Sequence, residues 1–218
     1  GTRVLFVVDR PPCQIFEATT TGSGKPRILL EGLQDQVPLD VSPDSRWLLY
    51  LQEMENLGIL PLGRPSERRL LRRSEGVQGF GRFSPDGRSL AYVSDESGRD
   101  EVWVRKFPDG AAGIQVSRDG GTEPLWSRDG RALYYRDATG QQLSQVTVSP
   151  GEPPEFGATT VTVGRWRRGS TDVRGYDIAP DGSLVILPQL TWPGVNIVLN
   201  FDVLGQRKLA EASTGLTR

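Results

Sequence analysis

The sequence of 218 residues contains no histidine and only one cysteine, Cys13. The absence of histidine excludes a Ser–His–Asp triad, a histidine-ligated zinc ion and an imidazole pH switch. A single cysteine can form neither an internal disulfide nor a cysteine cluster for a metal. Cys13 lies in the apolar stretch PPCQIF, where a free cysteine typically behaves as a small buried hydrophobe. The sequence therefore predicts no cofactor and no cysteine nucleophile.

Long apolar runs and a large net charge are also missing. No run reaches the ~18 apolar residues of a membrane-spanning helix, so we expect no direct membrane insertion. The formal net charge of −1 gives no general attraction to nucleic acid. The opening residues GTRVLFVVDR lack the apolar core of a signal peptide and favour a β-strand. Kinase phosphate-loop motifs and a Gly-x-Ser-x-Gly elbow are absent too.

A repeat is what the sequence does contain. The strings VSPDSRWLLYL, FSPDGRSLAYV, WSRDGRALYYR and IAPDGSLVILP begin at Val41, Phe83, Trp126 and Ile178, with separations of 42, 43 and 52 residues. A period of about 40–45 residues is typical of one four-stranded propeller blade. The longer third separation contains the insertion GRWRRGSTDVRG. The repeat therefore predicts an all-β fold, a β-propeller of four-stranded antiparallel blades.

Each repeat centres on a turn between its first and second strands. Proline pre-sets φ in three turns, and glycine supplies a positive φ at Gly87, Gly130 and Gly182. We expect the turn aspartates to accept hydrogen bonds from the following amides: Asp44, Asp86, Asp129 and Asp181. A third strand is expected over 14–19, 101–107 and 143–148. An arginine-flanked fourth strand, clearest over 68–73, is an outermost strand whose charges discourage pairing with neighbours.

The register of the repeat predicts the blade boundaries. GTRVLFVVD aligns with GRSLAYVSD, so Gly1 takes the place of Gly87 and the first blade lacks its inner strand. We expect a single propeller domain over 1–218, with a partial blade at 1–36 and whole blades at 37–78, 79–122, 123–170 and 171–210. About five blades are thus represented. An incomplete first blade predicts self-association through its open edge.

The repeats resemble a known family. The segment FSPDGRSLAYVSDESGRDEVWVRKFPDG is similar to TolB-like propeller repeats, which also occur in prolyl oligopeptidase-type peptidases. The runs VSRDGGTEPLWSRDGRALYYRD, GYDIAPDG and VNIVLNFDV resemble more closely the C-terminal propeller of bacterial eukaryotic-like serine/threonine kinases. This resemblance implies six blades, a periplasmic or other extracytoplasmic sensor or docking role, and no intrinsic catalysis.

Candidate binding residues follow from the expected blade geometry, because loops held by rigid sheets commonly carry function. Links between blades and loops between second and third strands should form one face. The binding residues predicted on that face are Gln36, Gln78, Glu123, Asp172, Arg174, Arg10, Arg99, Asp100 and Trp166. We place Glu123 and Arg174 at the mouth of the central channel. Trp166, flanked by arginines in the insertion, either anchors an interface or is buried against a neighbouring blade.

The mixed charges of this set favour a protein or peptide ligand over a polyanion. The leading hypothesis is a non-catalytic binding or sensor module of a larger bacterial signalling or envelope protein. One alternative is a propeller hydrolase with a channel-bound calcium ion, for which Asp35, Glu123 and Asp172 are the plausible carboxylates. Another is an architectural fragment that completes its ring by oligomerisation.

Overall fold

The computed structural model of the chain describes residues 2–8, 12–22, 24–31, 34–53, 55–71, 78–109, 113–149, 151, 154–163, 175–179 and 181–186. Of Gln78 and Ile186 it describes the backbone alone. The only helix within these ranges is the short 3-10 helix η1 (Pro65–Glu67). Everything else that is regular is β-strand, so the predicted all-β class is confirmed.

Three of the sheets have four antiparallel strands that follow chain order from one edge to the other. The second sheet contains β4 (Gln36–Val41), β5 (Trp47–Gln52), β6 (Asn56–Pro61) and β7 (Arg69–Leu70). The third contains β8 (Gln78–Phe83), β9 (Ser89–Ser94), β10 (Glu101–Lys106) and β11 (Gly113–Gln115). The fourth contains β12 (Gly121–Trp126), β13 (Ala132–Asp137), β14 (Leu143–Ser149) and β15 (Glu155–Val163). These are the four-stranded blades that the repeat predicts.

The first sheet differs from these three. It consists of β1 (Arg3–Val7), β2 (Ile15–Thr19) and β3 (Arg27–Leu30). In the repeat β1 corresponds to the second strands β5, β9 and β13, so no described strand takes the inner position of this sheet, as predicted. β16 (Tyr176–Ile178) and β17 (Leu184–Ile186) are the described strands of a fifth sheet.

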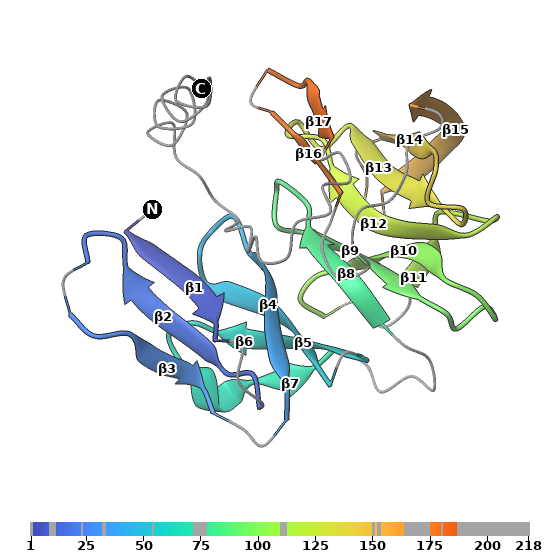
Figure 1. Ribbon diagram of the computed structural model, residues 1–218. Helices are drawn as coiled ribbons and strands as arrows, with labels where there is room; N and C mark the ends of the chain where they lie inside the picture. The colour runs from blue at the N-terminus through green and yellow to red at the C-terminus, as the bar shows by residue number, and fades with distance from the viewer. Residues whose placement is uncertain are drawn as a thin grey trace, which may run out of the picture.

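Consecutive sheets lie next to one another, as Figure 1 shows from blue to orange. Their first strands are in contact, β4 with β8 and β8 with β12. These strands begin at Gln36, Gln78 and Gly121, one or two residues before the blade starts predicted at 37, 79 and 123. The organisation of the whole chain as one domain stays a prediction.

The turn between first and second strands is built as predicted. In the third sheet Ser84 Oγ donates to Asp86 Oδ1 at 2.6 Å, and the amide of Arg88 donates to the same oxygen at 3.0 Å. Asp44, Asp129 and Asp181 accept the equivalent backbone bonds in the other turns. The residue after each aspartate has a positive φ, from 58° at Ser45 to 84° at Gly182. A serine in the first of these turns thus adopts the backbone conformation that glycine supplies in the others.

Apolar side chains from neighbouring sheets form the cores between them. Leu49 and Ile59 of the second sheet pack with Phe83 and Leu90 of the third. The next core joins the third and fourth sheets and includes Trp126, whose side chain is 7% exposed. Its indole nitrogen donates to the carbonyl of Arg82 at 3.3 Å, so this tryptophan bridges two sheets. Burial of these side chains is the main force that holds consecutive sheets together.

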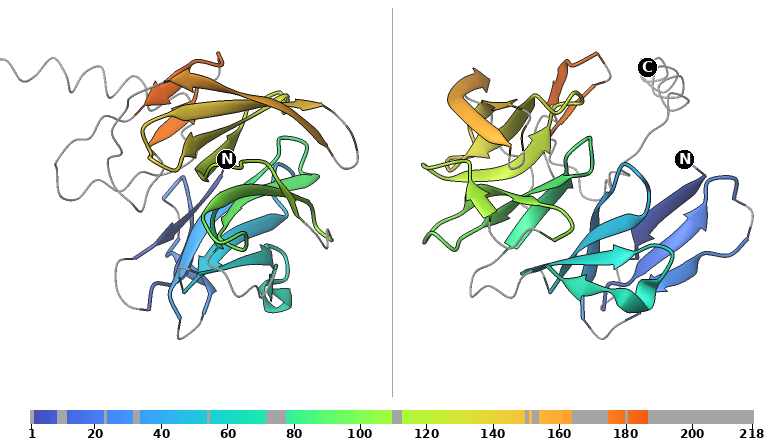
Figure 2. Two further views of the ribbon diagram at one scale, coloured as in Figure 1. Left: turned by 90° about the vertical axis from the view of Figure 1, so that its right-hand side faces the viewer. Right: turned by 180° about the vertical axis from the view of Figure 1, so that it is seen from behind.

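The outermost strands differ strongly in length. Of the fourth strand expected over 68–73, the described residues contain β7 with two residues, and Arg72 and Arg73 lie outside them. β11 has three residues and β3 has four, whereas β15 has nine. Figure 2 shows β15 as a long strand along the outer side of the fourth sheet.

Candidate functional site

The structure describes only part of the predicted binding set. Arg10, Trp166, Asp172 and Arg174 lie outside the described residues. The backbone of Gln78 begins β8, and its side chain is not described. The remaining predicted residues are Gln36, Arg99, Asp100 and Glu123. Their binding role stays a prediction, but their surroundings are defined.

Glu123 was predicted to lie in a link between blades, at the mouth of the central channel. The structure places it inside β12, where it is 0% exposed. Its Oε1 accepts a hydrogen bond from Arg136 Nη1 at 3.4 Å, and Arg136 is also 0% exposed. Oε2 accepts the amide of Gly175 at 3.0 Å, and the carbonyl oxygen of Glu123 accepts the Tyr176 hydroxyl at 2.6 Å. Glu123 therefore fastens the start of the fifth sheet to the fourth.

The backbone of Glu123 has a φ of 55°, in the left-handed region that is unusual for a residue other than glycine. Such strain often marks a functional site. Phe80 has a φ of 48° at the matching position of β8, and both strands carry an irregular pairing there. The conformation thus belongs to the repeated inner strand and not to the chemistry of Glu123.

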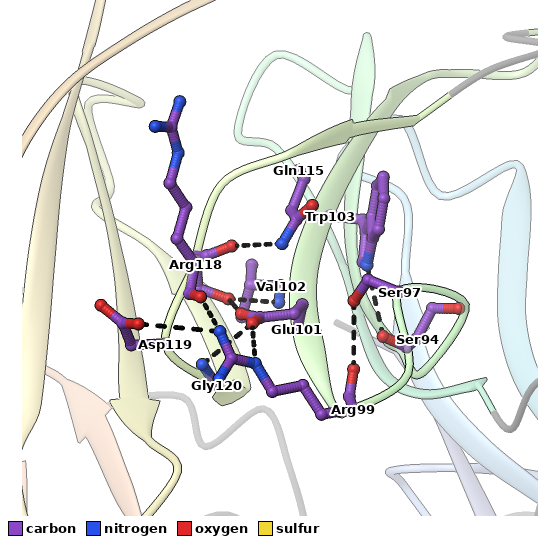
Figure 3. Close-up of polar contacts among 11 residues, drawn as sticks. Ser94, Ser97, Arg99, Glu101, Val102, Trp103, Gln115, Arg118, Asp119 and Gly120 are labelled. Atoms are coloured by element: carbon purple, nitrogen blue, oxygen red, sulfur yellow. Dashed lines mark hydrogen bonds and ion pairs between the residues drawn. The ribbon is translucent and has the colours of Figure 1, made fainter.

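A second buried carboxylate, Glu101, begins β10 and lies among the polar contacts drawn in Figure 3. Its Oε1 accepts Arg99 Nε at 2.7 Å and the amide of Gly120 at 3.0 Å. Its Oε2 accepts the hydroxyl of Ser117. Arg99 also donates to the carbonyl of Arg118. Together these bonds fix the link from β11 to β12.

Arg99 is therefore a half-exposed partner of a buried carboxylate, with 55% of its side chain accessible. Sequence reasoning did not select Glu101, although it adjoins Arg99 and Asp100. A charged residue at the first position of a strand is usually solvent-exposed, and its acceptor role depends on residues up to 19 positions away. The one signal in the sequence is the segment VSRDGG, which contains Ser117 and Gly120, the two donors that the structure places beside Glu101.

Asp100 and Gln36 complete the predicted residues that the structure describes. The Asp100 side chain is exposed, and the backbone carbonyl of Asp100 accepts a hydrogen bond from the amide of Gly121 at 2.9 Å. Gln36 is 1% exposed, and its amide donates to the carbonyl of Cys13 at 2.9 Å. The side-chain Oε1 of Gln36 is buried with no hydrogen-bond partner among the described residues.

The carboxylates considered for calcium are not brought together in the described part of the chain. Asp35 Oδ1 accepts the amide of Cys13 at 2.7 Å, and Glu123 is bound to Arg136 and Gly175. Asp172 lies outside the described residues. Among the residues described, no group of three or more histidine, cysteine or acidic side chains is placed to hold a metal ion.

An open hollow of about 520 Å³ lies at the other ends of the strands. Its lining comes mainly from the β4–β5 turn, the segment from β6 to η1 and the turn after β10, with Arg3 of β1 and Gly87 of the β8–β9 turn. Because paired strands are antiparallel, the connections that line the hollow lie at one end of the strands, and the β5–β6 and β9–β10 loops lie at the other end. The hollow is thus on the face opposite to the one predicted for binding.

Aromatic side chains form one wall of this hollow. Trp47 and Phe107 line it, and their rings meet edge to face with centroids 5.6 Å apart at 86°. Phe107 in turn packs against Phe83, with centroids 4.9 Å apart. Phe107 belongs to the core between the second and third sheets, and Trp47 packs against that core.

Charged groups of both signs surround the aromatic wall. Arg46 Nε donates to Asp44 Oδ2 at 2.6 Å, and Arg64 Nη1 donates to Glu67 Oε1 at 2.9 Å. The two arginine side chains are 77% and 74% exposed. The Ser42 hydroxyl, followed by Arg46, lowers the pKa of Asp44 to about 2, so this carboxylate is ionised at neutral pH.

Sequence reasoning missed the hollow because its residues come from segments that are far apart in the chain, from Arg3 to Pro108. Arg46 follows a repeat aspartate, and Arg64 belongs to the segment LGRPSE. The available signal was that segment, which separates β6 from β7 and has no counterpart of the same sequence in the third repeat. Only the fold places this segment beside the β4–β5 turn of the same sheet.

Comparison with known proteins defines the class of fold. No protein-family model matches the chain, and no curated protein matches it. TolB from Acinetobacter baumannii superposes with a TM-score of 0.54 and 18% identity, over 83% of this chain and 56% of that structure. A puromycin-hydrolyzing peptidase of Mycobacterium tuberculosis gives 0.61 and 20%, over 85% of this chain and 34% of that structure.

The β-propeller domain of Cps50 (Swd1) from Myceliophteria thermophila matches with a TM-score of 0.58 and 12% identity, over 88% of this chain and 64% of that domain. The chain therefore spans less than two thirds of each of these structures. At such low identities the similarity defines the fold alone. With the sheets described above, it establishes a β-propeller similar to those of TolB-like proteins. Within the described part of the chain, no helix has the length and apolar character needed to cross a membrane.

Proposed function

We propose that this propeller is a non-catalytic module that binds a protein or peptide. The observation that carries the proposal is the hollow of about 520 Å³ with its aromatic wall and mixed charges. Binding pockets typically measure about 300–1,000 Å³. Exposed arginines beside the partly buried Trp47 are among the residue types that dominate protein-binding hot spots. Acidic and basic groups side by side suit the alternating donors and charges of a peptide.

The buried carboxylates support a binding role over a hydrolytic one. Glu101 and Glu123 each accept hydrogen bonds from an arginine and from a backbone amide. Glu17 of β2 accepts Arg3 at 2.8 Å and Arg27 at 2.6 Å. A carboxylate held this way is occupied as an acceptor and lacks free access to a substrate, whereas a general acid or base must reach the reacting atom.

The module belongs, in this proposal, to a larger bacterial signalling or envelope protein and works outside the cytoplasm. The TolB structure that superposes on the chain and the sequence resemblance to TolB-like and kinase-associated propellers support that placement. A six-bladed ring is the corresponding expectation for the parent protein.

The test is selection of a phage-displayed library of random linear peptides on the immobilised chain. Enriched peptides should bind the wild type in solution, and Arg46→Glu with Arg64→Glu should raise their Kd by about tenfold or more. Both arginines are exposed, so the double variant should remain folded.

Arg131→Glu is the matched control, because Arg131 is exposed at the position of the fourth-sheet turn that Arg46 occupies in the second. This variant should bind like the wild type. If no peptide is enriched, or if the double variant and the control bind equally well, the proposed binding site is wrong.

A further inference from the structure

The outermost strand of the fourth sheet, β15, is long and almost free of charge, although its pairing with β14 is irregular at two places. β15 pairs with β14 on one side, and no described strand pairs with its other edge. Residues 157–162 are all exposed, and Val161 has 59% of its surface accessible. An open edge presents unpaired backbone N–H and C=O groups to any strand of complementary shape.

The other outer strands are protected by shortness or charge. β7 has two residues and includes Arg69, and β11 has three. β3 has four and begins with Arg27. β15 has nine residues, and after its first residue, Glu155, the sequence FGATTVTV contains neither a charge nor a proline. Threonine and valine are also residues that favour extended strands.

We propose that β15 is a self-association site, at which the β15 strands of two copies of this chain pair antiparallel. The two fourth sheets then form one continuous sheet of eight strands across the contact. This edge is distinct from the inner edge of β1, through which the sequence predicts self-association.

A second copy is the occupant that this strand suits best. Two-fold pairing places the same patch of both subunits face to face, so any charge near the axis meets its own like charge. Such an axis lies close to the arginine in the short strands β3 and β7, whereas the central residue of β15 is Thr159. Thr–Thr pairs across an antiparallel ladder are favourable. The single charge, Glu155, comes at one end of the strand, away from the centre of the pair.

Sedimentation velocity of the full chain over about 1 to 200 µM tests the proposal through mass action. The wild type should shift from monomer to dimer across this range. Val161→Lys should remain monomeric throughout, because pairing would desolvate the lysine. Val161 is 59% exposed and is not part of a described core cluster, so the variant should fold.

Val7→Lys on β1 is the matched control, since Val7 is also an exposed valine on an edge strand. This variant should dimerise like the wild type. A wild type that stays monomeric to 200 µM, or a Val161→Lys variant that dimerises unchanged, overturns the proposal. Loss of dimer in Val7→Lys but not in Val161→Lys assigns the contact to β1 instead.

Amide hydrogen exchange provides a second measurement that needs no variant. On concentration into the dimeric range, those amides of residues 156–163 that point away from β14 should exchange several-fold more slowly, whereas those of β1 should not change. Slowing confined to β1 would contradict the proposal.

Discussion

The two ends of the strands use polar residues in opposite ways. At the end that carries the links between sheets, Glu101 and Glu123 are 0% exposed and bind backbone amides of the following link. At the other end Arg46 and Arg64 are about three-quarters exposed beside an open hollow. Position at a loop face therefore does not identify a binding residue. What distinguishes the two sets is whether the side chain already has a buried backbone partner.

The links require such partners for a physical reason. Where the chain passes from the outer strand of one sheet to the inner strand of the next, its backbone amides have no neighbouring strand to hydrogen-bond with. Buried amides without acceptors are costly, so a carboxylate at the junction stabilises the crossing. The turns at the other end satisfy their own amides through the local aspartate, which leaves neighbouring side chains free for solvent or ligand.

The largest expected effect is at the Glu123–Arg136 pair. Glu123→Leu should lower the free energy of unfolding by about 3–5 kcal/mol, because Arg136 keeps its buried charge without the carboxylate. Urea unfolding followed by tryptophan fluorescence measures the change. The double variant with Arg136→Leu should recover part of the loss. If the single variant Glu123→Leu is as stable as the wild type, the Glu123–Arg136 pair does not stabilise the fold.

The next effect is at Glu101. Glu101→Ala should cost about 2–3 kcal/mol, because the amide of Gly120 and the hydroxyl of Ser117 lose a charged acceptor. The same urea titration measures it, with Asp100→Ala at the preceding residue as an exposed control expected to change stability by less than about 0.5 kcal/mol. Equal losses in both variants would remove the distinction drawn for the link.

These two carboxylates also show where sequence reasoning ended. The turn aspartates were predictable because their hydrogen bonds reach only to neighbours two residues away, as from Asp86 to Arg88. The partners of Glu101 are 16 and 19 residues distant, and Gly175 is 52 residues from Glu123. Such contacts depend on how consecutive sheets are arranged in space. The repeat therefore predicted the sheets and the turns but not the hydrogen bonds of Glu101 and Glu123 to the links between sheets.

The outer strands were only partly predictable for a related reason. The arginines at 68–73 correctly indicated an edge strand in the second sheet. A fourth strand was expected in each blade, but the bounds of β15 were not predicted, because the sequence EFGATTVTV has no arginines like those at 68–73 to indicate an edge. The hollow was not predicted because turns from the second and third sheets and the segment before η1 form it jointly.

A smaller effect concerns pH at the other end of the strands. Hydrogen bonds from Ser42 and then Arg46 lower the folded-state pKa of Asp44 from 3.8 to about 2. Its contribution to stability is therefore complete above about pH 4 and lost as the pH falls through about 2. Because the side chain is 44% exposed, we expect about 1 kcal/mol at most.

Thermal unfolding from pH 5 to pH 2 measures this contribution. The wild type should lose stability more steeply over that interval than Asp44→Asn. Parallel curves would show that the turn does not depend on the ionised carboxylate.

The smallest effect on stability is expected at the hollow itself. Arg46→Glu should change the free energy of unfolding by no more than about 0.5 kcal/mol, because its ion pair with Asp44 is at the solvent surface. Urea unfolding beside Arg131→Glu checks this expectation. A loss of several kcal/mol would mean that Arg46 has a structural role like that of Glu101.

The most direct test compares Arg99→Ala and Arg46→Glu in two measurements on the same samples, unfolding in urea and affinity for a peptide selected on the wild type. Both side chains are more than half exposed, but Arg99 donates to buried Glu101 whereas Arg46 borders the hollow. We predict that Arg99→Ala lowers stability and leaves the Kd unchanged, and that Arg46→Glu raises the Kd and leaves stability unchanged. The reverse pattern would contradict the assignment of structure to one end of the strands and binding to the other.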